Sequence, residues 1–438
     1  MVSWPPGTPQ RLRMSWRPLY SAALYLLMPA VLLRLVWRSR AHRGYRRGLP
    51  ERFGFVPRLH GRPAWFHCVS VGETLAAVAL IQEYRRRHPE TPVLVTTTTP
   101  TGSDRVRAAF GTDVHHVYLP YDLPGAIARF LDRVQPRLGV LMETELWPNL
   151  LAAARQRGIP MALLNARLSA RSARGYARVA GLLRPALDAL DLVGAQTRAD
   201  AKRFACLGLA PGRLRVFGSV KFDQQVSPEL VARGRELRRA LGSARPLWIA
   251  ASTHAGEEEA ALEAHRRLRE TLPEAGLVLV PRHPERFEAV AELCARQGFP
   301  AARRSSGAAP GAVAVYLGDT MGELPLMLAA ADVAFVGGSL VRRGGHNLLE
   351  PAALGLPVLT GPHTLNFHAI HRLLARGGGC RTVDSAEALA AALEALFRDP
   401  ANACRMGEAA RQVVARHQGA RDRMLEALEK LHRRRPAT

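Results

Sequence analysis

The fold of this chain is decided by a pattern that is clearest in residues 138–157, which read LGVLMETELWPNLLAAARQR. An apolar run, 138–142, is followed by a polar loop and then by the helical pattern of 150–157. The run shows little alternation with polar residues, which is typical of a parallel strand covered on both faces. The stretch therefore predicts one strand, loop and helix of an open α/β sheet.

The same unit recurs along most of the chain. Before a polar, arginine-rich stretch at 222–245, it predicts strands at 64–69, 93–97, 138–142, 161–164 and 192–195, with helices at 75–87, 126–134, 150–157 and 199–207. After that stretch it predicts strands at 247–251, 277–280, 313–317, 333–336 and 357–359, with helices at 257–272, 287–296, 324–330 and 348–354. We therefore expect an α/β fold of two Rossmann-like domains that face each other across a cleft.

An apolar N-terminal segment, PLYSAALYLLMPAVLLRLVW at 18–37, is about as long as a membrane-spanning helix. Pro29 and Arg34 interrupt it, and arginines flank it on both sides, more densely after it. This pattern favours a membrane anchor, spanning or interfacial, with the bulk of the chain on the cytoplasmic side. A buried core helix is the alternative. The expected layout is an extension (1–17), an anchor (18–40), a first domain (41–222), a linker (223–245), a second domain (246–425) and a basic tail (426–438).

Composition restricts the function further. The 438 residues carry a formal charge of +24, which implies an anionic partner such as nucleic acid, phospholipid or a phosphorylated substrate. The chain has no P-loop, no GxSxG and no GxGxxG after a strand, which excludes most kinases, hydrolases and dehydrogenases. The five cysteines show no metal-ligand spacing, and no interleaved aromatic platform indicates nucleic-acid binding.

In an open α/β sheet the ligand site lies beyond the carboxyl ends of the strands, so the loops there hold the candidate site residues. The loop after 64–69 begins with Ser70, Val71, Gly72 and Glu73. Glu73 at the start of a helix is a candidate general base, although an acid there also serves simply as a partner of the helix dipole.

The loop after 138–142 carries two carboxylates, Glu143 and Glu145, which are costly to place together unless cations compensate. Lys221 is a candidate cation. Lysine occurs elsewhere only at 202 and 430, so a compact ammonium in place of a guanidinium suggests a specific need. It would pair with Glu143 or neutralise phosphate charge; chance retention is the alternative.

In the second half, the loop Gly344-Gly345-His346-Asn347-Leu348-Leu349-Glu350-Pro351 has the chemistry of a nucleotide-sugar site. Paired glycines allow close approach of the backbone, a helix start favours phosphate, and a carboxylate can accept hydrogen bonds from ribose hydroxyls. An ordinary helix with a glycine-rich entry is the alternative. Further strand-end candidates are Ser252, which would cap a helix or hold phosphate, Arg282 as a phosphate clamp, and the turn Met321-Gly322-Glu323.

Together these motifs resemble the Kdo (3-deoxy-D-manno-octulosonic acid) transferases of lipopolysaccharide synthesis. The resemblance covers residues 15–425 and rests on the motifs ERFG at 51–54, SVGE at 70–73, ETELWPN at 143–149, FGSVKFD at 217–223, PRHPERF at 281–287, MGE at 321–323 and NLLEP at 347–351. It implies a GT-B glycosyltransferase at the cytoplasmic face of the inner membrane. Such an enzyme transfers Kdo from CMP-Kdo to a lipid A precursor, lipid IVA, with inversion.

By motif, the resemblance also implies residue roles. Glu73 would be the general base, with Glu143 and Lys221 positioning substrate or stabilising the transition state. The acceptor site would further include Ser70, Gly72 and Glu145. The CMP pocket would include Ser252, Arg282, His283, Met321, Gly322, Glu323, Asn347, Leu348, Leu349 and Glu350. No cofactor is expected, and because no Asp-x-Asp motif is present, no metal either.

Two other functions stay open at this point. One is another GT-B enzyme, a different nucleotide-sugar glycosyltransferase or an epimerase. The other is a basic membrane-associated protein that binds anionic lipid without catalysis. The anchor and the acidic loops disfavour the first, and repeated strand-end loops are not needed for the second.

Overall fold

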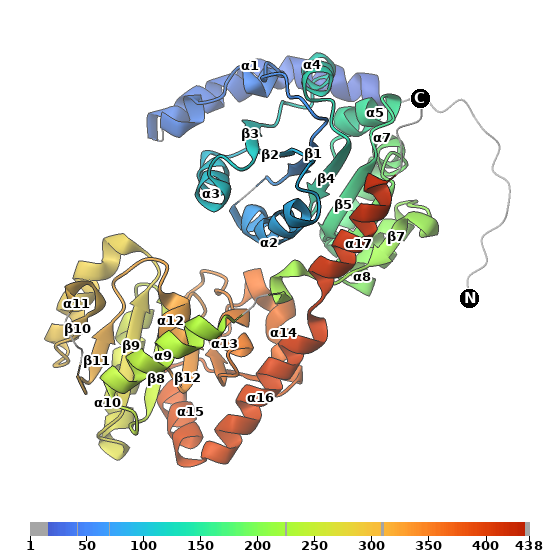
Figure 1. Cartoon of the computed structure of the whole chain (residues 1–438). Coiled ribbons are helices and arrows are strands. Elements are labelled where there is room, and N and C mark those ends of the chain that lie inside the picture. Colours follow the sequence, from blue (N-terminus) through green and yellow to red (C-terminus); the bar gives the residue numbers. More distant parts are fainter. Residues whose placement is uncertain (1–15, 42, 70, 224–225, 308–310, 434–438) are drawn as a thin grey trace. The chain divides into compact units, whose positions relative to one another are not determined.

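The computed structural model describes residues 16–41, 43–69, 71–223, 226–307 and 311–433 (Figure 1). The described chain forms two compact units. Unit 1 contains the residues up to Val220 and those from Gly419 onward, and unit 2 is Lys221–Gln418. Each is described below by itself.

Unit 1 is built on a parallel sheet in the order β3-β2-β1-β4-β5-β6-β7. Its strands are β1 (Ala64–His67), β2 (Val93–Thr97), β3 (His115–Tyr118), β4 (Leu138–Met142), β5 (Met161–Ala166), β6 (Leu192–Ala195) and β7 (Leu214–Val216). Strand β1 pairs with β2 on one side and with β4 on the other. The winding therefore reverses between β1 and β4, which is where open α/β sheets bind ligands.

The helices of unit 1 are α1 (Arg17–Ala41), α2 (Val71–Arg87), α3 (Pro100–Phe110), α4 (Pro124–Val134), α5 (Pro148–Gln156), α6 (Ala170–Arg178), α7 (Ala180–Leu187), α8 (Arg198–Cys206) and α17 (Ala420–His432). Short 3-10 turns lie at η1 (Arg43–Arg46), η2 (Glu51–Phe53) and η3 (Pro211–Arg213), and η4 (Val220–Phe222) leads into unit 2. Proline in the first turn starts α4 and α5, where a missing N–H costs nothing.

Unit 2 repeats this architecture with a sheet in the order β10-β11-β9-β8-β12-β13-β14. Its strands are β8 (Leu247–Thr253), β9 (Gly276–Pro281), β10 (Ala302–Arg303), β11 (Val315–Leu317), β12 (Val333–Val336), β13 (Val358–Thr360) and β14 (Cys380–Thr382). Its helices are α9 (Pro228–Leu241), α10 (Glu257–Thr271), α11 (Phe287–Arg296), α12 (Leu324–Leu328), α13 (Leu349–Ala353), α14 (His368–Arg376), α15 (Ala386–Arg398) and α16 (Pro400–His417), with 3-10 turns η5 (Pro284–Arg286), η6 (Arg304–Ser306) and η7 (Leu365–Phe367). The winding reverses between β8 and β12, which are paired.

The end of the chain corrects the expected boundaries. Helix α17 belongs to unit 1, where Met424, Leu425 and Leu428 are buried in the core with residues of β1 and α2. The second domain therefore ends at Gln418 and not at 425, and residues 426–432 are a packed helix and not a basic tail. The expected linker at 223–245 contains α9, which buries Leu237 and Leu241 in unit 2.

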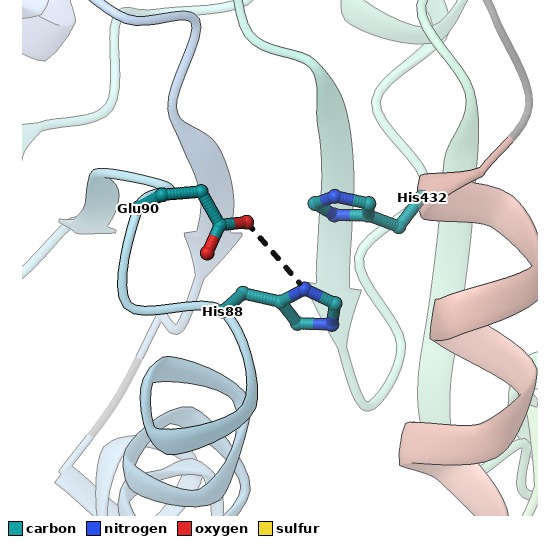
Figure 2. A group of neighbouring side chains, drawn as sticks. All are labelled: His88, Glu90 and His432. Atoms are coloured by element: carbon teal, nitrogen blue, oxygen red, sulfur yellow. Dashed lines mark ion pairs between the residues drawn. The ribbon is translucent and has the colours of Figure 1, made fainter.

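The last turn of α17 is held by aromatic side chains. Tyr84 of α2 and Nδ1 of His432 share a hydrogen bond of 2.6 Å. The rings of His88 and His432 stack with centroids 4.3 Å apart and an angle of 20° between planes (Figure 2). Nearby, Arg87 forms an ion pair of 2.9 Å with Glu429 of α17. These contacts fix the end of α17 against α2.

Helix α1 is, within the described ranges, the one helix long and apolar enough to cross a membrane. It is nevertheless attached to unit 1. Near its start, the hydroxyls of Tyr20 and Ser21 donate to Asp122 Oδ2 (3.0 Å) and Asn149 Oδ1 (3.1 Å). Its partly buried residues recur with a helical period, as expected if one face lies on protein: Ser21, Leu24, Met28, Leu32, Leu35 and Ser39.

Candidate active site

The first group of candidate residues lies at the switch point of unit 1. Helix α2 begins four residues earlier than predicted, so Glu73 stands in its first turn. The Glu73 side chain is buried, with 8% exposed, and its Oε2 accepts a hydrogen bond of 2.7 Å from the backbone N–H of Val69. Glu143 follows directly on the neighbouring strand β4, and its backbone N–H donates to the carbonyl of Leu164 on β5 (2.9 Å).

A buried thiol between these loops shows that the two carboxylates share one environment. Burial raises the pKa of the Cys68 thiol well above its ordinary value, and the negative charges of Glu73 and Glu143 raise it further. Both carboxylates must therefore lie near the end of β1. The structure brings together the two acids that the sequence had placed in separate loops.

Glu145 lies in the same loop as Glu143 and is held by its neighbour. The indole Nε1 of Trp147 donates a hydrogen bond of 2.8 Å to Glu145 Oε2. Burial raises the pKa of Glu145, the charge of Glu143 raises it as well, and the Trp147 bond opposes the shift. Glu145 is thus oriented by the indole beside a second acid.

Two residues at the carboxyl edge of the unit 1 sheet have a strained backbone conformation. Glu143 has φ 61° and Asn165, at the end of β5, has φ 52°. Non-glycine residues in the left-handed region cost free energy and cluster at functional sites. The fully buried Asn165 side chain has no hydrogen-bond partner for either amide atom among the described residues. No sequence signal pointed to Asn165.

Asp122 is a second residue that the sequence did not indicate. Its carboxylate accepts hydrogen bonds from the backbone N–H groups of Asn149 (3.0 Å) and Leu150 (2.8 Å) at the start of α5. Burial raises its pKa to about 6, against the effect of these hydrogen bonds. The Asn149 Nδ2 in turn donates to the carbonyl of Asp122 (2.6 Å), so the two residues together hold the start of α5.

The remaining acceptor-side candidates are Gly72, Ser70 and Lys221. Gly72 lies exposed in the first turn of α2, and Ser70 is outside the described residues. Lys221 lies in η4, where the chain passes from unit 1 to unit 2.

The second group lies at the carboxyl edge of the unit 2 sheet and is rich in imidazoles. His254 follows β8, His283 follows β9, and His346 lies in the glycine-rich loop before α13. The Nε2 atoms of His254 and His346 are 2.8 Å apart, and their rings are nearly parallel (13°) with centroids 5.1 Å apart, which places them edge to edge and not face to face. The ring of His283 meets that of His254 edge-on at 5.3 Å and 66°. The sequence had marked His283 but not the other two as site residues.

The loop after β12 has backbone N–H groups that are suited to binding an anion, but a carboxylate of the chain already accepts their hydrogen bonds. The buried carboxylate of Glu257 accepts hydrogen bonds from the backbone N–H groups of Gly338 (2.6 Å), Ser339 (2.9 Å) and Leu340 (2.9 Å). It also accepts one from the N–H of His254 (3.1 Å). Glu257 thus fixes the loop after β12 against the loop after β8.

The loop of Asn347 and Glu350 differs in detail from the expectation. Helix α13 is short, and the Asn347 Oδ1 already accepts the N–H of Leu349 (3.1 Å), so the predicted phosphate site at a helix start is not supported. The Asn347 Nδ2 donates to Glu350 Oε1 (2.9 Å). Burial raises the pKa of Glu350, while Asn347 and the charge of Arg282 oppose the rise. Leu348 and Leu349 are buried and position this pair.

The remaining donor-side candidates, which differ in their surroundings, are Glu323, Met321, Gly322 and Ser252. Glu323 is bound by Arg304 in two contacts of 3.0 and 2.7 Å, which lowers its pKa to about 2, so its carboxylate has a structural partner. Met321 is 57% exposed at the same turn, and Gly322 adopts φ 84°. Ser252 has φ 57° at the end of β8.

One further cluster has the composition of a metal site. Ligand atoms of His88, Glu90 and His432 lie within 4.8 Å of one another (Figure 2). The two imidazoles are stacked, however, so their in-plane lone pairs run side by side and do not converge on one point. The cluster fits the role of fixing α17.

Two Rossmann-like units, each with polar groups at its switch point, define the GT-B class of glycosyltransferase folds. The same two-domain fold is found in the UDP-GlcNAc 2-epimerase of Neisseria meningitidis, with a TM-score of 0.57 and 14% identity over 84% of this chain and 100% of that one. This likeness supports the expected fold class and nothing beyond it.

Sequence comparison then specifies the family. A family model described as 3-deoxy-D-manno-octulosonic-acid transferase (kdotransferase) matches residues 47–224. A 3-deoxy-D-manno-octulosonic acid transferase of Haemophilus influenzae is 43% identical over 94% of this chain and 98% of its own length. One of Bordetella pertussis is 44% identical over 94% and 99%. The chain belongs to the Kdo transferase family and is a glycosyltransferase, which decides against an epimerase or a non-enzymatic lipid-binding protein.

Proposed function

We propose that this enzyme transfers Kdo from CMP-Kdo to lipid IVA, the lipid A precursor, with inversion and release of CMP. The observation that carries the proposal is the placement of Glu73: a buried carboxylate in the first turn of α2, at the unit 1 switch point, beside Glu143. Membership of the Kdo transferase family supports the choice of the sugar.

Glu73 acts as the general base. A sugar hydroxyl is a poor nucleophile until its proton is removed, and a positioned base contributes about 10²–10⁴-fold to the rate. The hydroxyl proton passes to the Glu73 carboxylate while the oxygen attacks the anomeric carbon of Kdo. One base and no covalent intermediate give inversion. Glu143 and Lys221 position the reacting groups, and Gly72 and Glu145 border the acceptor site.

Unit 2 holds the CMP portion of the donor. Arg282 and His283, after β9, lie next to the His254–His346 pair and supply positive charge and N–H donors for the phosphate. The Asn347–Glu350 pair offers a carboxylate oxygen to the ribose hydroxyls. Ser252 and the 321–323 turn border the same pocket. These cations stabilise the departing phosphate, so neither a metal nor another cofactor is required for that task.

The enzyme is held at the cytoplasmic face of the inner membrane by α1. The helix is bonded to unit 1 near its start, and at its end Arg46 of η1 donates to Ser39 (3.0 Å). Its exposed side chains are mostly apolar, with Arg34 exposed among them, and the large apolar ones are Leu19, Tyr25, Leu26, Leu27, Val31, Leu33, Val36 and Trp37. A helix that is bonded to a domain on one face and exposes apolar side chains on the other lies along one leaflet, with its apolar face among the lipid tails. That position would keep unit 1 beside its lipid acceptor.

Mass spectrometry of products tests the function directly. Purified enzyme with CMP-Kdo and lipid IVA should yield lipid IVA carrying Kdo, together with CMP. Replacing CMP-Kdo by a UDP-sugar, or lipid IVA by phospholipid alone, provides the controls. Transfer from the UDP-sugar but not from CMP-Kdo would refute the proposed donor.

A further inference from the structure

In the donor site, the imidazoles of His254 and His346 are hydrogen-bonded to each other. Two ring nitrogens 2.8 Å apart require one proton between them, so one ring is the donor and the other the acceptor. If the pair gains one more proton, at an outer Nδ1, this hydrogen bond survives and becomes charge-assisted. A second additional proton would break it. The pair is therefore built to accept one proton.

The surroundings keep the pair uncharged at rest. Burial lowers the pKa of His346 to about 4, and His254, Arg282 and His283 add to the effect. Burial also lowers the pKa of His254; the charge of Glu257 opposes the shift, and His283, Arg343 and Arg282 add to it. Glu257 is already engaged by backbone N–H groups, and Glu350 faces Arg282. Cations thus outnumber available carboxylates around the pair.

Kdo transfer changes the charge of the phosphate at this place. The donor is a phosphodiester with one negative charge. When the bond between the anomeric carbon and the phosphate oxygen breaks, its electron pair stays on that oxygen, and the monoester formed has a second pKa of about 6. CMP therefore carries close to two charges at neutral pH. An anion within about 4–6 Å raises the pKa of an imidazole by about 1–3 units.

We propose that the His254–His346 pair takes up one proton as the phosphate of CMP gains its second negative charge. The inference rests on the proposed function, since it places the CMP phosphate at this cluster. The acceptor's hydroxyl proton goes to Glu73 and then to solvent, the pair takes one proton from solvent, and it returns that proton when CMP leaves. A bond forms between the acceptor oxygen and the anomeric carbon of Kdo. The bond between that carbon and the phosphate oxygen breaks, and its electron pair stays on the phosphate, so the total charge is conserved.

Calorimetry with CMP tests the inference without any turnover. Titrations near pH 8, in buffers of different ionisation enthalpy, count the protons taken up, because a monoester with a second pKa of about 6 is fully ionised there. The wild-type enzyme should take up part of a proton with CMP at pH 8, with the uptake rising as the pH is lowered to 7, and little with the methyl diester of CMP, which has one charge like the donor. His254→Gln and His346→Gln, which keep a polar side chain but do not titrate, should lose the uptake and bind CMP about tenfold more weakly.

Controls separate the pair from its neighbours. His371→Gln alters an imidazole on α14, whose partner is Thr382, and should leave uptake and affinity unchanged. Uptake that persists in both His254→Gln and His346→Gln, or that disappears only in His283→Gln, would overturn the inference. A wild-type enzyme that makes Kdo–lipid yet takes up no proton refutes the inference alone. An enzyme that neither binds CMP nor makes product refutes the proposed function with it.

Discussion

The hydroxyl of Tyr84 on α2 and Nδ1 of His432 on α17 lie 2.6 Å apart and join residues 348 positions distant in the chain. His432 also stacks on His88. Burial, together with the charges of Arg137, His88 and Arg433, lowers the pKa of His432 to about 4, although Glu90 opposes the shift. The end of the described chain is thus held by the imidazole of His432, which is neutral at neutral pH.

Stability should therefore fall on mild acidification. An imidazole in the unfolded chain has a pKa of about 6.5, above the folded value of about 4 for His432. Between these values the unfolded chain binds more protons, so the free energy of unfolding decreases as pH falls through that window. Denaturant melts of the wild type and of Tyr84→Phe/His432→Phe, which keeps the rings but removes the titration, should show a shallower slope in the variant.

The comparison requires controls because His67, His116 and His265 also have lowered pKa values through burial. They should give the double variant a residual slope. His60→Phe, at an exposed position, should behave like the wild type. Superimposed slopes for wild type and double variant would show that His432 titrates alike in folded and unfolded chains.

Glu73→Gln should separate binding from chemistry. The amide keeps an oxygen to accept the Val69 N–H but cannot take a proton, so transfer should fall by about 10²–10⁴-fold. CMP affinity and thermal stability should stay near the wild-type values. Glu145→Gln is the matched comparison, since it leaves a candidate acceptor for the Trp147 indole, and should retain more activity. Turnover of Glu73→Gln within a few-fold of wild type would remove Glu73 from the role of base.

The strands that the sequence predicted are those inside the sheets. All four edge strands were missed, namely β3, β7, β10 and β14. Each has exposed or half-exposed residues, with His115 exposed in β3 and Arg381 in β14, so no unbroken apolar run marks it. An unbroken apolar run indicates a strand only where neighbours cover both of its faces.

The candidate site divides in the same way. Residues at strand ends, such as Glu73, Glu143 and Arg282, could be found because the topology of parallel strands gathers such loops. Two other features could not be predicted from the local sequence. His254 and His346 are in contact although they are 92 positions apart in the chain. The Asn165 side chain, buried without hydrogen-bond partners among the described residues, lies at a local bulge in β5. Nor does helix periodicity indicate against which sheet an amphipathic helix packs, so α17 was divided between the second domain and a basic tail.

Chelation should leave the reaction intact. The chain has no Asp-x-Asp motif, and Arg282 provides positive charge, and the imidazoles around it N–H donors, for the leaving phosphate. Initial rates measured after dialysis against EDTA should match untreated enzyme. Added Mg²⁺ should change the rate less than twofold. A complete loss restored by Mg²⁺ would require a metal in the transition state.

Glu350 should govern donor binding and not the chemical step. Its carboxylate is oriented by the Asn347 amide, and loss of one hydrogen bond to a ribose hydroxyl corresponds to about tenfold in affinity. Glu350→Ala should raise the KM for CMP-Kdo by roughly that factor with kcat little changed, and Glu350→Gln should recover part of the loss. A normal KM in Glu350→Ala, or a fall confined to kcat, would contradict this division of roles.

Helix α1 should bind membranes in the plane of one leaflet. Leu26 is 82% exposed and Leu33 71%, on the face away from the partly buried residues of the helix. Placing arginine at either site puts a charge among lipid tails, so Leu26→Arg and Leu33→Arg should each weaken binding to anionic vesicles by about tenfold or more. Leu373→Arg, on α14 of unit 2, should not. Trp37, at 68% exposed, should be quenched by lipids brominated near the headgroup more than by those brominated at the tail ends. A helix accessible to protease from both sides of a sealed vesicle would indicate a spanning anchor.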